Sequence, residues 1–198
     1  MKEIDIFDFD KTLVPFDSGS LFWFYCLIHN PWIVICVPYL FVMMIPFFLG
    51  IKGLTYAKKH LFCYVPLINL EKNVKGFWDK YEKDVFEWFR KENRERPAVV
   101  ISASPDFLLE DICARLEVEK LICTRHSSKT GAIIGLNCKD EEKVRRYNEE
   151  ISGCKVINVS SDSLKSDRPI FSLGENCFHI VKNGERVPFK YSEMYGNK

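Results

Sequence analysis

The chain has 198 residues, of which 47% are hydrophobic, and its 28 basic and 27 acidic side chains leave a formal net charge of +1. This composition is too apolar for a disordered protein and is sufficient for one catalytic core that carries an insertion. The balanced charge gives no overall field that would attract nucleic acid, so we expect no nucleic-acid partner.

The eight cysteines are scattered along the chain and form no C-x-x-C pair. This spacing argues against a zinc site and against a disulfide framework, so we expect reduced thiols. The first residues are typical of a strand and do not form a signal peptide. Together these features predict a cytoplasmic protein.

Five short apolar runs are typical of buried strands. They comprise residues 4–7, 98–101, 120–124, 156–159 and 177–181. Residues 17–95 instead show the apolar spacing of helices, including an amphipathic pattern from Val74 to Phe89, and contain no strand pattern. Further helices are expected from Pro105 to Leu116 and over residues 140–151. Strands that alternate with helices predict an α/β fold with a parallel sheet.

Two smaller segments have less regular patterns. Thr130, Gly131 and Gly135 predict a turn or a small flap after the third strand. The tail from residue 190 to 198 has no strong pattern, and we expect it to be mobile.

The first strand ends in Asp8-Phe9-Asp10-Lys11-Thr12, which places two carboxylates two residues apart. One carboxylate can attack phosphorus and form an acyl phosphate, while the other protonates the leaving alkoxide and later activates water. The alternative is a solvated strand end with two chance aspartates. In the catalytic interpretation, Asp8 and Asp10 are the catalytic residues.

Ser102 ends the second strand, where its hydroxyl and the following N–H groups can bind phosphate oxygens near a helix N-terminus. Helix capping is the alternative role, and we assign it to Ser104 because Pro105 and Asp106 are suited to a first turn. Lys143 can neutralise the nucleophile and the phosphate during transfer. A solvated helix lysine is an equally good interpretation of that residue.

Asp162 and Asp167 follow the fourth strand and supply two more acids. A carboxylate nucleophile repels a phosphate dianion, and oxygen ligands suit Mg²⁺, which would offset that repulsion. Asp162 is the better candidate ligand because it lies nearer the strand end. The alternative is a capping aspartate and a loop aspartate.

In this order, these residues resemble the four motifs of the haloacid dehalogenase superfamily of phosphatases, and the resemblance covers nearly the whole chain. The motifs are Asp8-Phe9-Asp10-Lys11-Thr12, Ser102, Lys143, and Asp162 with Asp167. The long helical insertion after the first motif resembles the cap of the phosphoserine-phosphatase-like subgroup. The apolar cap segment, Trp88-Phe89-Arg90, Ile101-Ser102-Ala103-Ser104-Pro105 and Asp167-Arg168-Pro169-Ile170 together look most like bacterial phosphatidylglycerophosphatase C proteins.

The resemblance implies a Rossmann-like core formed by residues 1–16 and 97–198, with residues 17–96 as a helical cap. It implies that Asp8 is the nucleophile, that Asp10 is the acid/base, and that Ser102 and Lys143 bind phosphate.

For magnesium, the resemblance implies ligands from Asp8, the Asp10 carbonyl and Asp162, with Asp167 as a further candidate ligand. Two positions depart from the pattern. Lys11 replaces a commoner glycine, and Ser161 stands where glycine is frequent.

Residues 31–51 form an uncharged apolar run of a length that could span a bilayer. Pro38 and Pro46 would kink a spanning helix, which favours a helical hairpin that docks on the membrane surface. The third interpretation is a cap whose apolar helices pack on one another. Lys52, Lys58, Lys59 and His60 follow the run and would suit anionic headgroups at the inner face of the cell membrane.

The sequence therefore predicts a magnesium-dependent phosphatase that acts on a lipid phosphate such as phosphatidylglycerol phosphate. The alternatives are a soluble phosphatase of a small metabolite such as phosphoserine and, less in keeping with the intact acid set, a membrane-associated binding module. Asp10 argues against dehalogenation, which does not need this acid/base.

Overall fold

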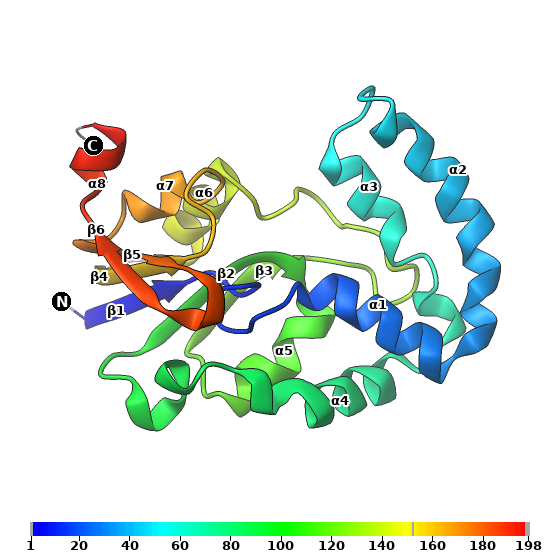
Figure 1. The fold of residues 1–198 in the computed structure, drawn as a ribbon, viewed down its shortest axis with the longest axis horizontal. Coiled ribbons are helices and arrows are strands. Elements are labelled where there is room, and N and C mark those ends of the chain that lie inside the picture. Colours follow the sequence, from blue (N-terminus) through cyan, green and yellow to red (C-terminus); the bar gives the residue numbers. More distant parts are fainter. Residues whose placement is uncertain (1, 152, 197–198) are drawn as a thin grey trace.

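One mixed sheet forms the centre of the molecule in the computed structural model, which describes residues 2–151 and 153–196. The strand order is β3-β2-β1-β4-β5-β6, and every neighbouring pair is parallel except β5 with β6. The strands are β1 Lys2–Phe7, β2 Ala98–Pro105, β3 Lys120–Thr124, β4 Cys154–Ser161, β5 Asn176–Ile180 and β6 Arg186–Phe189. The predicted α/β fold with a Rossmann-like parallel sheet is confirmed (Figure 1).

Alternating side chains of the central strands belong to two separate hydrophobic clusters. Ile4 and Ile6 of β1 belong to one cluster, whereas Phe7 belongs to the other. β2 divides in the same way, with Val99 on one side and Val100 on the other. Because successive residues of a strand point to opposite faces, both faces of the sheet must be covered. Helices α4 and α5 lie on one side and α6 and α7 on the other (Figure 1).

The helices follow the predicted chain order. They are α1 Ser18–His29, α2 Cys36–Phe48, α3 Leu54–Leu61, α4 Leu70–Tyr81, α5 Asp106–Arg115, α6 Glu141–Glu150, α7 Arg168–Phe171 and α8 Tyr191–Tyr195. The first four form a helical insertion between β1 and β2, as expected. Two buried hydrogen bonds hold this insertion in place. Within it, Asn30 Nδ2 donates to Asn73 Oδ1 at 2.7 Å. Trp78 Nε1 of α4 donates to the Leu108 carbonyl of α5 at 2.7 Å.

The structure corrects the amphipathic pattern from Val74 to Phe89. Helix α4 ends at Tyr81, and the chain continues in short 3-10 turns at Glu82–Asp84 and Glu87–Phe89. Phe89 is fully buried, and its ring packs edge-on against Phe7 with centroids 5.0 Å apart. Tertiary packing therefore explains these apolar positions, which the sequence pattern assigned to a continuous helix.

Two features near the C-terminus also differ from expectation. β6 was not predicted. Its Pro188 is tolerated because β6 lies at the sheet edge. The tail predicted to be mobile contains α8, and the Tyr195 hydroxyl donates to the Leu164 carbonyl at 2.5 Å. Residues 197 and 198 of that tail lie outside the described residues.

The turn predicted around Thr130 and Gly131 contacts the end of α3. A single antiparallel bridge joins His126 to Ile133, and Gly131 has a φ of +72°. A Cβ placed on Gly131 would lie 1.9 Å from the carbonyl oxygen of Phe62, so only glycine allows this close approach. The turn therefore couples the segment after β3 to the helical insertion.

We expect Gly131→Ala to lower the free energy of unfolding by more than about 2 kcal/mol, because it adds a backbone clash to the left-handed strain. Gly135→Ala is a matched control: its φ is +77°, but no atom lies within 4 Å of the added Cβ. It should lose only about 1 kcal/mol. Urea unfolding of both variants measures the difference, and equal losses would show that the turn does not contact α3 in solution.

Candidate active site

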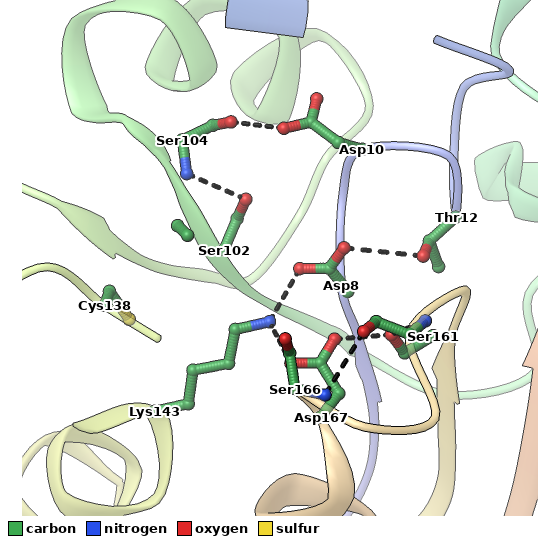
Figure 2. Close-up of polar contacts among 12 residues, drawn as sticks. Asp8, Asp10, Thr12, Ser102, Ser104, Cys138, Lys143, Ser161, Ser166 and Asp167 are labelled. Atoms are coloured by element: carbon green, nitrogen blue, oxygen red, sulfur yellow. Dashed lines mark hydrogen bonds and ion pairs between the residues drawn. The ribbon is translucent and has the colours of Figure 1, made fainter. Parts of the chain in front are cut away.

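The carboxyl ends of β1, β2 and β4 meet at a polar cleft of about 180 Å³ beneath the helical insertion. All six predicted site residues line it: Asp8, Asp10, Ser102, Lys143, Asp162 and Asp167. Parallel strands present their carboxyl ends at one sheet edge, so residues far apart in sequence come together here. Figure 2 shows Lys143 reaching from α6 to carboxylates that follow β1 and β4.

Lys143 lies between two carboxylates at the centre of the cleft. Its Nζ is 2.7 Å from Asp8 Oδ1 and 2.7 Å from Asp167 Oδ1, and all three side chains are buried. Burial alone would disfavour the ammonium, but the two carboxylates outweigh it and hold the pKa of Lys143 above its ordinary value. The interpretation of Lys143 as a solvated helix lysine is therefore wrong.

The ionised form of Asp8 remains unfavourable despite its ion pair with Lys143. Burial raises the pKa of Asp8 to about 7, Lys143 opposes that rise, and the nearby Asp167 carboxylate adds to it. The pKa of Asp162 is also raised, first by burial and then by Asp167. Lys143 thus only partly offsets the cost of burying these carboxylates.

Two side chains that sequence reasoning did not assign to the site fix its carboxylates. Thr12 Oγ1 lies 3.5 Å from Asp8 Oδ2 and accepts the Asp162 N–H at 3.0 Å, which joins the ends of β1 and β4. Ser161 Oγ donates to Asp167 Oδ2 at 2.5 Å. Ser161, noted only as a departure from glycine, thus orients the acid that pairs with Lys143. A small hydroxyl residue beside a motif acid was the available signal.

Asp10 is held by the segment that begins the insertion. The Ser18 N–H donates to Asp10 Oδ1 at 2.7 Å, and the Ser104 hydroxyl donates to Asp10 Oδ2. Burial raises the pKa of Asp10, the Asp17 carboxylate raises it further, and these hydrogen bonds oppose the rise. A raised pKa favours the protonated form that can donate a proton to a leaving group.

The predicted capping role of Ser104 is wrong. Strand β2 runs to Pro105, which is itself the N-cap of α5 and makes no side-chain capping hydrogen bond. The Ser104 N–H instead donates to Ser102 Oγ at 3.2 Å, while the Ser104 hydroxyl faces Asp10 (Figure 2). Ser102 is buried at the cleft wall, with its hydroxyl proton free to turn toward a bound oxyanion.

Lys58 is also misplaced by the sequence interpretation, which grouped it with cations facing lipid headgroups. It projects from α3 into the cleft, where its Nζ donates to the Ala103 carbonyl at 3.2 Å. Burial lowers the pKa of Lys58, and the carboxylates of Asp10 and Asp17 oppose that effect. The insertion therefore supplies a cation to the same cleft that holds Asp8.

The donor set suits a hard divalent cation. Asp8 and Asp162 present carboxylates to the cleft, and within the described residues the Asp162 carboxylate has no hydrogen-bonding partner. Asp167 is already engaged by Lys143 and Ser161. Among residues 2–151 and 153–196, no three acidic, histidine or cysteine side chains form a complete metal cage. Mg²⁺ tolerates this, because it uses one or two carboxylates and keeps several waters.

Comparison with known proteins agrees with this geometry. The model of the haloacid dehalogenase-like hydrolase family matches residues 6–172. No curated protein sequence matches the chain significantly. A protein of unknown function from Bordetella pertussis Tohama I is similar in structure, with a TM-score of 0.67, 15% identity, and 90% of each chain covered.

Two further solved structures share this fold. A phosphoserine phosphohydrolase-like protein from Francisella tularensis has a TM-score of 0.57 and 17% identity over 91% of this chain and 88% of its own. A phospho-aspartyl intermediate analogue of phosphoserine phosphatase has a TM-score of 0.54 and 17% identity over 90% and 86%. Because the family model spans residues 6–172, which include every acid and cation of the cleft discussed above, the chain belongs to the haloacid dehalogenase-like hydrolase family.

Proposed function

We propose that the protein is a magnesium-dependent phosphatase that hydrolyses a phosphate monoester through a phosphoryl group carried by Asp8. The contact of Lys143 Nζ with both Asp8 and Asp167 carries this proposal. The buried Lys143 ammonium orients the Asp8 carboxylate for attack. The same ammonium can neutralise negative charge on a bound phosphate. Similarity to phosphoserine phosphatase structures, one of them an analogue of a phospho-aspartyl intermediate, supports the same chemistry.

The proposed reaction has two steps. A carboxylate oxygen of Asp8 forms a bond to phosphorus as the bond from phosphorus to the ester oxygen breaks, and Asp10 donates its proton to the departing oxygen. Asp10 then accepts a proton from water, whose oxygen attacks phosphorus and releases Asp8 and inorganic phosphate. Ser102 and Lys143 hold the phosphoryl oxygens throughout. Mg²⁺ held by Asp8 and Asp162, with the Asp10 carbonyl, would lower the charge repulsion between nucleophile and phosphate.

A lipid phosphate, such as phosphatidylglycerol phosphate, is the proposed substrate class. The segment Pro31–Phe48 has a mean hydropathy of 2.1, yet only 11% of it is buried. Phe41, Phe48 and Leu49 are 73%, 78% and 66% exposed. Such a continuous apolar surface is costly in water and typical of a membrane contact. A cap formed of apolar helices packed on one another would bury these side chains, so this exposure disfavours that interpretation.

Docking on one leaflet fits better than spanning. The helical segment Pro31–Phe48, which includes α2, is long and apolar enough to cross a bilayer, but the contacts of the flanking helices favour docking. The chain then returns through α3, whose Lys58 reaches Ala103 in the sheet layer. Helices α1 and α3, which flank the apolar segment, therefore both contact the catalytic cleft, which we place at the cytoplasmic face of the membrane.

The first test addresses the nucleophile. Asp8→Asn should lower kcat by at least about a thousandfold, because an amide keeps the shape but cannot attack phosphorus. Asp84→Asn, in the 3-10 turn after α4, should keep wild-type activity. Phosphate release with Mg²⁺ and para-nitrophenyl phosphate measures both rates. A loss of less than tenfold in Asp8→Asn, with an unchanged melting temperature, would contradict the assignment.

The second test addresses the cation supplied by α3. Lys58→Met should raise KM for a phosphate ester by about tenfold or more, since a charged hydrogen bond contributes about 1.5–3 kcal/mol. Lys59→Met removes the same charge from an exposed position on the same helix and should change KM by less than about twofold. Equal effects of the two variants would mean that only the general positive charge of α3 matters.

The third test separates a lipid from a soluble substrate. Val42, Ile45 and Leu49 are exposed apolar side chains of the segment from α2 to its C-cap. Replacing all three with Ser should lower both vesicle binding and lipid-phosphate turnover by at least about tenfold, because each apolar side chain contributes burial free energy in lipid. Hydrolysis of para-nitrophenyl phosphate and the melting temperature should stay unchanged. Unchanged vesicle binding and turnover would favour a soluble metabolite such as phosphoserine.

A further inference from the structure

An apolar groove of about 390 Å³ lies between α1, α2 and the end of α3. Its walls include Trp23 and Phe24 of α1, Leu40 and Met44 of α2, and Leu61 of α3. Among the residues that line the groove, Ser20 and Trp23 carry polar side-chain groups, and the others present hydrocarbon, aromatic or thioether groups. The Trp23 indole N–H is itself buried without a hydrogen-bond partner. A polar ligand would lose its hydration here and gain few partners, so the groove suits a hydrocarbon chain.

The groove begins next to the catalytic cleft. On α1, the Ser18 N–H donates to Asp10, and Ser20 lines the groove only two residues later. On α3, Lys58 lines the cleft, and Leu61 lines the groove three residues later. Residues three apart share a helix face, so Lys58 and Leu61 place parts of both sites on one face of α3. Residues of α1 and of α3 thus contact both the polar cleft and the apolar groove.

We propose that this groove binds an alkyl chain of the substrate whose phosphate lies against Asp8. The inference rests on the proposed phosphatase function and narrows its substrate to a phosphate ester that carries a hydrocarbon chain. Lys58 of the cleft and Leu61 of the groove lie on the same face of α3, so Lys58 can meet the anionic end of such a molecule. Met44 suits the role because its flexible thioether adapts to chains of different shape.

The groove shares Phe41 and Phe48 with the exposed apolar surface of α2, but part of that surface lies outside the groove. Val42 and Ile45 lie on the same helix α2 and are exposed, but they do not line the groove. Substitutions at Val42 and Ile45 therefore test membrane docking without changing the lining of the groove. Chain binding and membrane binding can consequently be measured independently, provided that the ligand is soluble and monomeric.

The test uses alkylphosphonates, whose carbon–phosphorus bond a phosphatase does not hydrolyse, below the concentrations at which they form micelles. Calorimetry with Mg²⁺ should give an octylphosphonate Kd at least tenfold lower than that of butylphosphonate, since each fully buried methylene contributes up to about fourfold. Ser20→Trp, which places a large ring in the lining of the groove, should remove this dependence on chain length. Ile45→Trp adds the same side chain to α2 outside the groove and should keep it.

Phe24→Gln provides a second variant if Ser20→Trp does not fold, because Phe24 is 59% exposed and its replacement leaves the buried core intact. Equal affinities for the two phosphonates in the wild-type protein would overturn the proposal. So would a chain-length dependence that survives both groove variants, or sedimentation showing that the groove is covered by a second copy. Hydrolysis of alkyl phosphates is measured separately. Chain-dependent binding without hydrolysis would refute the phosphatase function and leave the groove assignment standing.

Discussion

The ion pairs of Lys143 with Asp8 and Asp167 constrain the rest of the molecule, because they bury one ammonium between two carboxylates. Removing one partner from a buried pair typically costs about 3–5 kcal/mol, so the three side chains must arrive together. They come from β1, from α6 and from the loop after β4. The neighbouring positions of β1 and β4 in the sheet meet this requirement, and Thr12 fixes their relative position through Asp8 and Asp162. The carboxylates of Asp8 and Asp162 account for the suitability of the cleft for a divalent cation.

The helical insertion has two unlike surfaces, and this contrast connects the chemistry to the proposed substrate. Its inner side brings Lys58 to Ala103 and Ser18 to Asp10, and both contacts end in the catalytic cleft. Its outer side, on α2, exposes large apolar side chains. A soluble substrate would contact only the inner side and would leave the exposed apolar side chains of α2 without a binding partner. A lipid phosphate would use both, with its headgroup beside Lys58 and its apolar part beside α1 and α2.

Sequence patterns predicted the parallel sheet and the positions of the motif acids, because both depend on local signals. Apolar runs that end in polar residues mark strand ends, and Asp8 and Asp162 directly follow β1 and β4. Ser102 departs from this rule, because β2 continues past it to Pro105. The patterns failed where tertiary contacts determine the conformation. Phe89 is buried by Phe7 and not by a helix, and Ser104 hydrogen-bonds Asp10 and does not cap α5. Lys58 was assigned to a surface because sequence alone does not reveal that α3 turns one face toward the sheet.

The account depends most on covalent catalysis by Asp8. Rapid acid quenching of the protein during turnover of a radiolabelled phosphate ester, followed by peptide mass spectrometry, would locate a trapped phosphoryl group. The account predicts an acid-stable, base-labile label on Asp8 that is absent from Asp8→Asn. A label on another residue, or steady turnover without any labelled intermediate, would contradict it.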